Sequence, residues 1–441
     1  MEYKAPPTPY GGIYKQLPAE TGPHLMVSGP SGVGKSRRVL GPGIRIWDGP
    51  VVAVSSKPDL VELCLDGRRY DGGGGRTYVL DLSGEVPDRM LPAGVERVVL
   101  DPTQLLENDD DATDMATVLL QAGTVGGGGG STKGGDSFWE TVSTGPLAGI
   151  LRAAGADGVA WAREAVENVG KLGEDGEITD EPSWMTAIER LESMDSIYAR
   201  QLASAIERED KMRDSVMITM LAALAPWGRS TVRASRGERA FVPSMLEHPR
   251  ATLFVVAPAT GVAAGAAVAC VDVISKRWRA NQTEEVRLPR LLMVVDELTN
   301  TMPWPKLPTV VTEARAMGIH LLVAVQATSQ LAKRYGSEGM TELRQVFPSV
   351  LLLVGAAEKE MLEDAAWAYG KVDRSRSTVD HRGRQSHSVD TSDVMTGADL
   401  LPRSMDHGRL LRGKPHGDTS PRMDPAGVRV DLLDISQMRF D

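Results

Sequence analysis

The stretch GPSGVGKS, residues 29–36, follows the apolar run HLMVS and decides the fold class of this chain. It has the pattern G-x-x-x-x-G-K-[ST], whose glycines let successive backbone N–H groups point into one concavity. Lys35 would reach the β- and γ-phosphates of a nucleotide, and the Ser36 hydroxyl would bind Mg²⁺. The alternative is a glycine-rich turn without a ligand. We predict a phosphate-binding loop made of Gly29, Pro30, Ser31, Gly32, Val33, Gly34, Lys35 and Ser36.

The elements around this loop should be a short apolar strand before it and a helix that starts near Lys35. The N-terminus of that helix would add its positive dipole end to the phosphate site. We expect the helix to be short, because the GPG sequence at 41–43 should end or kink it.

Short apolar runs rich in β-branched residues alternate with helical patterns along the chain. Continuous apolar strands between helices are typical of a mostly parallel sheet covered on both faces, so we predict an α/β fold. The predicted strands lie at 25–28, 51–55, 77–81, 97–101, 252–257, 291–296, 319–326 and 350–354.

The stretch from about Phe138 to Trp227 has apolar residues at three- and four-residue spacing and no convincing strand. We therefore predict an all-helical insertion in the sheet domain. The predicted organisation is a tail at 1–22, the first part of the sheet domain at 23–137, the helical insertion at 138–227 and the second part at 228–441. We interpret 71–76 as a turn, 123–136 as a flexible connection and 107–114 as a solvated surface segment.

Composition narrows the possible functions. The 441 residues carry a net charge of −10, which argues against a protein that passively coats nucleic acid but permits a motor with local basic loops. Cys64 and Cys270 lie in apolar surroundings and suggest buried thiols in a reducing compartment. The N-terminal segment lacks the features of a signal peptide, and the apolar stretch 253–271 is broken by Pro258. We expect 253–271 to be a strand leading into a buried helix of small residues, and the protein to be soluble.

An acidic pair, Asp296 and Glu297, follows the predicted buried strand LLMVV. The carboxyl ends of strands in open α/β sheets are where ligands bind. Asp296 would orient Mg²⁺, and Glu297 would act as the general base that polarises the attacking water. On its own such a pair could merely cap a surface strand; together with the phosphate-binding loop it predicts a hydrolytic site.

Two further residues are candidates for the same site. Gln326 ends the apolar run HLLVAVQ, where its amide could hydrogen-bond the γ-phosphate or the attacking water. Arg315 lies near the end of a predicted helix in TEARAMGIH. It could pair within its own domain, or it could reach a neighbouring subunit as an arginine finger.

The order of these blocks resembles the conjugative coupling proteins, the VirD4/TraG/TraD group of type IV secretion ATPases. The resemblance covers most of the chain and rests on GPSGVGKS, GPVVAVSSKPDL, GDSFWETVSTGPLAGIL and HGRLLRGKPHG. Its most specific block is VVDELTNTMPWPKLPTVVTEARAMGIHLLVAVQATSQLAKRYG, which joins the acidic pair, a proline-rich link, the arginine and the glutamine in one order.

The resemblance implies a RecA-like P-loop ATPase with an inserted helical domain, assembled as a homo-hexamer in the cytoplasm. It would use ATP and Mg²⁺ to pass single-stranded DNA, with its relaxase, or a protein substrate to a type IV secretion channel. Carried over by residue, Lys35 and Ser36 hold phosphates, Asp296 and Ser36 bind Mg²⁺, Glu297 is the base, Gln326 the sensor and Arg315 the arginine that acts in trans.

Two departures from the family pattern stand out. Family members commonly have an aspartate where this chain has Ser55 or Ser56, which puts a role for that strand end in doubt. Most also carry N-terminal transmembrane helices, whereas here the strand before the phosphate-binding loop starts almost at once. We therefore expect another chain to supply any membrane anchor.

Two other functions remain open at this point. An FtsK/HerA-like or viral-packaging pump for double-stranded DNA would share the loop, the acidic pair and the glutamine, but would lack a helical insertion here. An ATP-gated adaptor that does not translocate would be free to lose Glu297.

A charged segment, 371–393, has strand-like alternation around an RGR turn. It is predicted either to be a solvated hairpin or to face DNA in a channel. The arginines concerned are Arg374, Arg376, Arg382 and Arg384.

Overall fold

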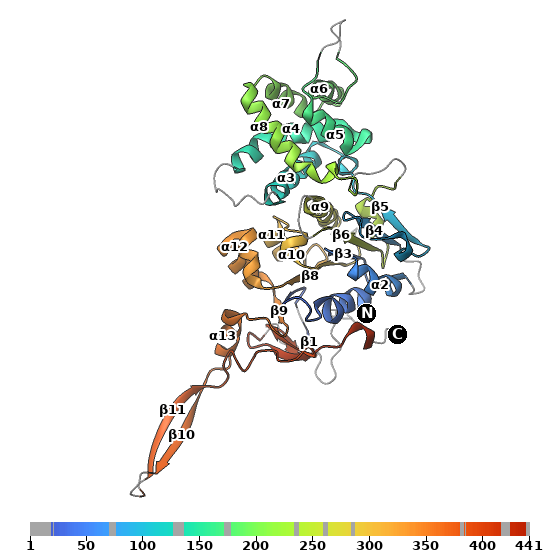
Figure 1. Ribbon diagram of the computed structural model, residues 1–441. Helices are drawn as coiled ribbons and strands as arrows, with labels where there is room; N and C mark the ends of the chain where they lie inside the picture. Colours follow the sequence, from blue (N-terminus) through green and yellow to red (C-terminus); the bar gives the residue numbers. More distant parts are fainter. Residues whose placement is uncertain are drawn as a thin grey trace. The chain divides into compact units, whose positions relative to one another are not determined.

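The computed structural model describes residues 19–20, 22–69, 76–126, 136–171, 178–232, 238–258, 263–283, 287–379, 383, 385–415 and 424–437. The chain forms two compact units. Unit 1 combines Met1–Trp47 with His320–Asp441, and unit 2 is Asp48–Ile319. In each unit the described residues contain a sheet and helices, so the α/β prediction is confirmed (Figure 1).

The sheet of unit 1 has the strand order β14 (Val428–Asp431), β12 (His407–Leu411), β9 (Ser349–Leu352), β2 (His24–Ser28) and β8 (Ile319–Val325). β2 is parallel to both β8 and β9, while β12 is antiparallel to β9 and β14. All residues of β2, β8 and β9 are buried, which explains their continuous apolar sequences. A separate short pair joins β1 (Ala19–Glu20) to β13 (Lys414–Pro415).

The helices of unit 1 are η1 (Ser36–Leu40), α1 (Gly41–Ile46), η7 (Thr328–Leu331), α12 (Ala332–Val346), α13 (Lys359–Trp367) and η8 (Ile435–Gln437). A two-stranded ribbon, β10 (Lys371–Val379) and β11 (Gln385–Asp393), follows α13 and projects from this unit (Figure 1). The ribbon confirms the predicted hairpin. Arg382 and Arg384 lie outside the described residues.

GPG does not end the first helix, although the helix is short, as expected, and changes from π-helical to α-helical at Gly41. A π-helical turn, η1, continues directly into α1, and GPG forms the first turn of α1. Pro42 is tolerated there because the first N–H groups of an α-helical segment need no partner within it.

The sheet of unit 2 is parallel, in the order β7 (Leu291–Val295), β3 (Val51–Ser55), β6 (Thr252–Val256), β4 (Thr77–Asp81) and β5 (Val95–Val98). β5 ends at Val98, before the predicted end at 101, because Val99 bridges Ala240 instead. The remaining elements around this sheet are α2 (Asp59–Arg69), η2 (Asp88–Met90), η6 (Pro243–Leu246), α9 (Ala264–Ala280), α10 (Leu298–Thr301) and α11 (Leu307–Glu313).

A helical cluster occupies one end of unit 2 (Figure 1). Its central helix, α4, contacts α3, α5, α6, α7 and α8. The cluster begins at Asp109 with α3, well before the expected start at 138, and the acidic run 107–114 supplies the first turns of that helix. Its elements are η3 (Pro102–Leu105), α3 (Asp109–Gly126), α4 (Asp136–Ala154), η4 (Gly155–Asp157), α5 (Gly158–Glu167), α6 (Trp184–Ser193), α7 (Tyr198–Ile206), α8 (Asp210–Ala223) and η5 (Ala225–Gly228).

The apolar stretch at 253–271 behaves as expected: β6 is fully buried, and the buried face of α9 is largely alanine and valine. Among the described residues, no helix combines the length and apolarity that crossing a membrane requires. Cys64 and Cys270 are free and buried, and burial raises the pKa of the Cys270 thiol.

Candidate nucleotide site

The loop after β2 has the backbone of a phosphate cradle. Gly32 and Gly34 have φ angles of +81° and +91°, a left-handed conformation that side chains with a Cβ rarely adopt. Gly29 is buried, and a Cβ there would lie 3.0 Å from the Leu353 Cβ and from a Val33 methyl. Glycine is therefore required at three positions of GPSGVGKS for conformation or close packing, which a simple surface turn would not need.

Lys35 directs its ammonium group back over this loop. Its Nζ donates to the carbonyl oxygens of Gly29 at 2.6 Å and Pro30 at 2.9 Å, and the residue is 7% exposed. Ser36 begins η1, and the Arg38 N–H donates to the Gly34 carbonyl at 2.8 Å. The loop therefore combines a positive charge, a helix N-terminus and a hydroxyl, the groups that suit a phosphate and its Mg²⁺.

Gln326 lies beside this loop in unit 1. β8 pairs with β2 so that Val325 is opposite Ser28, and the Gly29 N–H donates to the Val325 carbonyl at 3.2 Å. A cavity of about 670 Å³ is lined by residues of both segments, including Pro30 and Gln326. Parallel pairing thus brings the predicted sensor and the phosphate-binding loop together.

A buried carboxylate that sequence reasoning missed lies in the same cavity wall. Glu358, 6% exposed, accepts hydrogen bonds from the Ser28 hydroxyl at 2.7 Å and from the Thr328 N–H and hydroxyl at 2.7 and 2.6 Å. Arg344 donates to the Thr328 hydroxyl at 2.8 Å and lies 3.5 Å from Glu358. Glu358 is six positions beyond the end of β9, whereas Asp296 follows β7 directly, so the pattern that identified Asp296 did not point to Glu358.

Asp296 and Glu297 follow β7 in unit 2. Asp296 is 8% exposed, and its N–H donates to the Val54 carbonyl at 2.8 Å. Glu297 has φ +54° and ψ +52°, the left-handed conformation that costs energy for any residue but glycine. Its carbonyl accepts hydrogen bonds from the N–H groups of Asn300 and Thr301, so α10 holds the strained residue in place. Such strain is characteristic of functional sites.

Arg315 also belongs to unit 2, in the turn after α11, and is exposed. Among the described residues its guanidinium makes no ion pair or side-chain hydrogen bond. Ser55, one of the two serines where the family resemblance leads us to expect an aspartate, is buried and its hydroxyl donates to the Lys57 carbonyl. Ser55 therefore stabilises its own turn.

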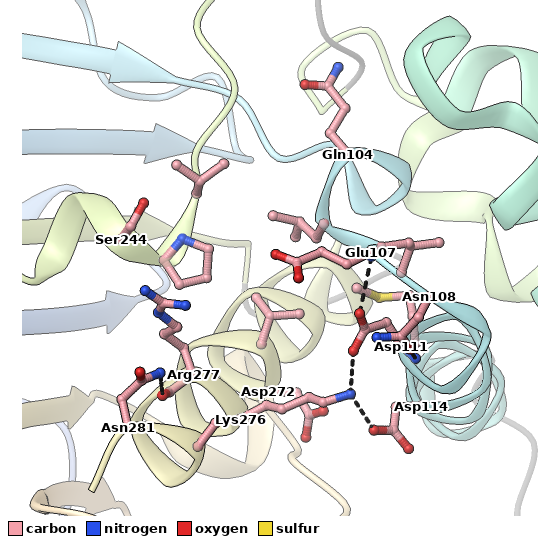
Figure 2. Close-up of a pocket in the computed structure, with 17 residues that line it drawn as sticks. Gln104, Glu107, Asn108, Asp111, Asp114, Ser244, Asp272, Lys276, Arg277 and Asn281 are labelled. Carbon is pink, nitrogen blue, oxygen red and sulfur yellow. Dashed lines mark hydrogen bonds and ion pairs between the residues drawn. The ribbon is translucent and has the colours of Figure 1, made fainter. Parts of the chain in front are cut away.

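A second cavity, of about 540 Å³, lies within unit 2 between the helical cluster and α9 (Figure 2). Lys276 of α9 donates to Asp111 at 2.6 Å and to Asp114 at 2.7 Å, both on α3. Burial alone would raise the pKa of Asp111, but hydrogen bonds from Lys276 and the backbone outweigh it and hold that pKa below its usual value. The acidic run lies at the surface, as predicted, and it also takes part in an ion-pair network that ties α3 to α9.

Comparison with known proteins adds to this geometry. Residues 290–405 match the family described as the TraM recognition site of TraD and TraG, a range that includes Asp296, Glu297, Arg315 and Gln326. No curated protein sequence matches the chain.

The fold is similar to that of a solved bacterial coupling protein. The unbound monoclinic form of the conjugative coupling protein TrwBΔN70 has a TM-score of 0.62 and 17% identity, covering 94% of this chain and 85% of that one. TrwB in complex with a non-hydrolysable ATP analogue has a TM-score of 0.61 and 18% identity, covering 98% and 90%. TrwB in complex with ADP and Mg²⁺ has a TM-score of 0.58 and 18% identity, covering 92% and 88%.

Proposed function

We propose that this chain is a TraG/TraD-type coupling protein, a motor that hydrolyses ATP to deliver DNA, with its bound protein, to a type IV secretion channel. The observation that carries the proposal is the parallel pairing of β2 with β8. This pairing places Gln326 beside a phosphate-binding loop in which two glycines have positive φ angles. The family match over 290–405 supports the conjugative role. The nucleotide complexes of TrwB support ATP and Mg²⁺ as cofactors.

In the proposed reaction the loop N–H groups and Lys35 hold the β- and γ-phosphates. Lys35 exchanges its hydrogen bonds to the Gly29 and Pro30 carbonyls for phosphate oxygens, so the ammonium is already oriented when ATP binds. Ser36 and Asp296 would hold Mg²⁺ through oxygen ligands, and the bound ion would neutralise developing charge on the phosphates. Glu297 accepts a proton from the attacking water, and Gln326 hydrogen-bonds that water or the γ-phosphate.

The proposed assembly is a homo-hexamer in which Arg315 acts on the nucleotide of a neighbouring subunit. Its exposure and its lack of a described side-chain partner suit a residue that acts across a boundary. The region matched to a TraM recognition site would contact relaxosome proteins. We place the protein in the cytoplasm, with the membrane reached through another chain.

ATP hydrolysis by the purified chain, with and without single- or double-stranded DNA, tests this function. We expect hydrolysis that single-stranded DNA stimulates and that Lys35→Ala abolishes. Stimulation by duplex DNA alone would favour a duplex pump. Nucleotide binding without hydrolysis under every condition would favour an adaptor and contradict the motor.

A further inference from the structure

Two arginines face each other across the outer strands of unit 1. β12 and β14 are antiparallel, and Arg409 is directly opposite Arg429 in their register. Opposed residues in an antiparallel pair point to the same face with Cβ atoms about 5 Å apart, and like charges at such positions destabilise the sheet. A protein with a net charge of −10 thus concentrates positive charge at one place, where packing alone would not favour it.

Burial makes this arrangement more costly. Arg409 is partly buried, and desolvation together with the charge of Arg429 outweighs a hydrogen bond with Tyr369 and lowers the pKa of Arg409. The nearest carboxylate on the same face of the strand pair, Asp431, is 2.8 Å from the His407 ring. Among the described residues, Arg429 has neither an ion pair nor a side-chain hydrogen bond.

A small cavity makes room for a ligand at this place. Its volume is about 170 Å³, and Arg403, Arg409 and Arg429 all line it. Arg403 donates to the Ala398 carbonyl at 3.3 Å, and Arg409 to the Leu400 carbonyl at 3.4 Å. The one carboxylate in its wall, Asp399, accepts hydrogen bonds from the Thr396 N–H and hydroxyl. Three guanidinium groups around a cavity of this size suit a phosphate group, which they can bind through paired N–H donors.

An exposed aromatic residue that lies close in sequence to a partner of Arg409 favours nucleic acid as the ligand. Tyr369 hydrogen-bonds Arg409, and Trp367, two residues earlier in the chain, is 83% exposed. Bases of a single strand stack on exposed aromatic side chains, so a tryptophan close to a phosphate site favours a single-stranded nucleic acid, and the competing anions in the test below distinguish it from an acidic peptide or a lipid surface.

We propose that Arg403, Arg409 and Arg429 form a site for the phosphodiester backbone of a single-stranded nucleic acid, with Trp367 stacking on a neighbouring base. The site deepens the proposed function and rests on it, because a coupling motor must grip its DNA. It is separate from the hairpin arginines of β10 and β11 and from the nucleotide loop.

The test measures binding of a fluorescein-labelled thymidine 30-mer to the full chain between 50 and 300 mM salt. The variant is Arg403→Gln with Arg429→Gln; both residues are exposed, and Arg409 is kept because it contacts the backbone. The control is Arg200→Gln with Lys333→Gln, which removes the same charge from exposed helix positions. Each lost phosphate contact on a single strand lowers the magnitude of the slope of log K against log salt concentration by about 0.7. Two lost contacts should therefore lower that slope by about 1.4 and the affinity at 0.1 M salt by about 25-fold.

Trp367→Ala supplies a second readout. Loss of one stacked base should weaken binding of the single strand by about tenfold and leave the salt dependence of binding unchanged. Polyglutamate and vesicles with phosphatidylglycerol serve as competing anions. Thermal melts of all variants check that the fold is intact.

A slope change in the arginine variant, together with an affinity loss in Trp367→Ala, supports the site. The proposal is overturned if the arginine variant matches its control, if Trp367→Ala binds like the wild type, or if the variant loses only polyglutamate or vesicle binding. Should the wild-type chain bind no DNA at all, the proposed function fails as well; normal DNA binding by the variant overturns this site alone.

Discussion

The backbone strain at Glu297 allows catalysis and stability to be separated at one residue. A residue with a Cβ pays about 1–2 kcal/mol for the left-handed conformation, and glycine does not. Here Glu297 precedes α10 without a side-chain cap hydrogen bond, so replacing the side chain removes no cap. Comparing two substitutions that both remove this side chain isolates the strain itself.

Two substitutions measure it. Glu297→Gly and Glu297→Ala both remove the carboxylate, but only glycine relieves the strain. Glycine also loses about 0.5–1 kcal/mol in backbone entropy, so we expect the glycine variant to be more stable than the alanine variant by about 1 kcal/mol. In a domain of this size that corresponds to a melting temperature about 2 °C higher.

Calorimetry and urea unfolding give the stability order, and steady-state hydrolysis gives the activity. Both variants should bind ATP and lose turnover by about two orders of magnitude or more, because a general base acts in the transition state. Glu297→Gln should lose turnover to the same extent. An alanine variant as stable as the glycine variant would show that no strain is stored there, and wild-type hydrolysis by Glu297→Gln would remove the base assignment.

Three further predictions concern other parts of the chain. Lys35→Ala should abolish ATP binding in calorimetric titration, since its ammonium holds phosphates in the ground state; retained affinity would contradict that role. Mixing Arg315→Ala with Glu297→Gln subunits should restore some hydrolysis if Arg315 acts in trans, and mixtures that stay inactive would place it in its own subunit. Arg37 hydrogen-bonds Asp434 and holds the pKa of that carboxyl well below its usual value. The pair therefore stabilises the fold above pH ~4 and loses this contribution as the pH falls below it, so the difference in unfolding free energy between wild type and Asp434→Asn should shrink on acidification. A difference that does not change with pH would contradict this.

The sequence predicts the strands well because their signal is local. Each buried strand at the centre of the sheets is a continuous apolar run, and the end of such a run falls within a residue or two of the strand's end in most cases. β5 is the exception: it ends at Val98, and the next residue, Val99, bridges Ala240, far away in the sequence. The outer strands β12 and β14 carry charged residues and have no apolar run to identify them.

Long-range pairing explains the other differences. The ion pair between Lys276 of α9 and Asp111 of the acidic run joins residues 165 positions apart, so no local pattern indicates it. Glu358 has no partner near it in sequence, since Ser28 is 330 positions away and Thr328 is 30. Motifs defined by spacing, such as GPSGVGKS, could be found from the chain alone, whereas residues defined by what they touch could not.

The Glu358 network bears on how nucleotide hydrolysis could move a substrate. The Glu358 carboxylate accepts hydrogen bonds from Ser28, which precedes the phosphate loop, and from Thr328, which is two residues after Gln326. These bonds fix the ends of β2 and β8 to each other. Glu358 is also the residue that precedes α13, and the ribbon β10–β11 begins a few residues after that helix ends. Satisfied buried networks of this kind are rigid, because each member that leaves exposes an unpaired polar group at a cost of about 1–3 kcal/mol. A displacement of Gln326 on loss of the γ-phosphate would therefore be carried through Thr328 and Glu358 into α13, in the part of unit 1 that holds the ribbon, Trp367 and the arginine site.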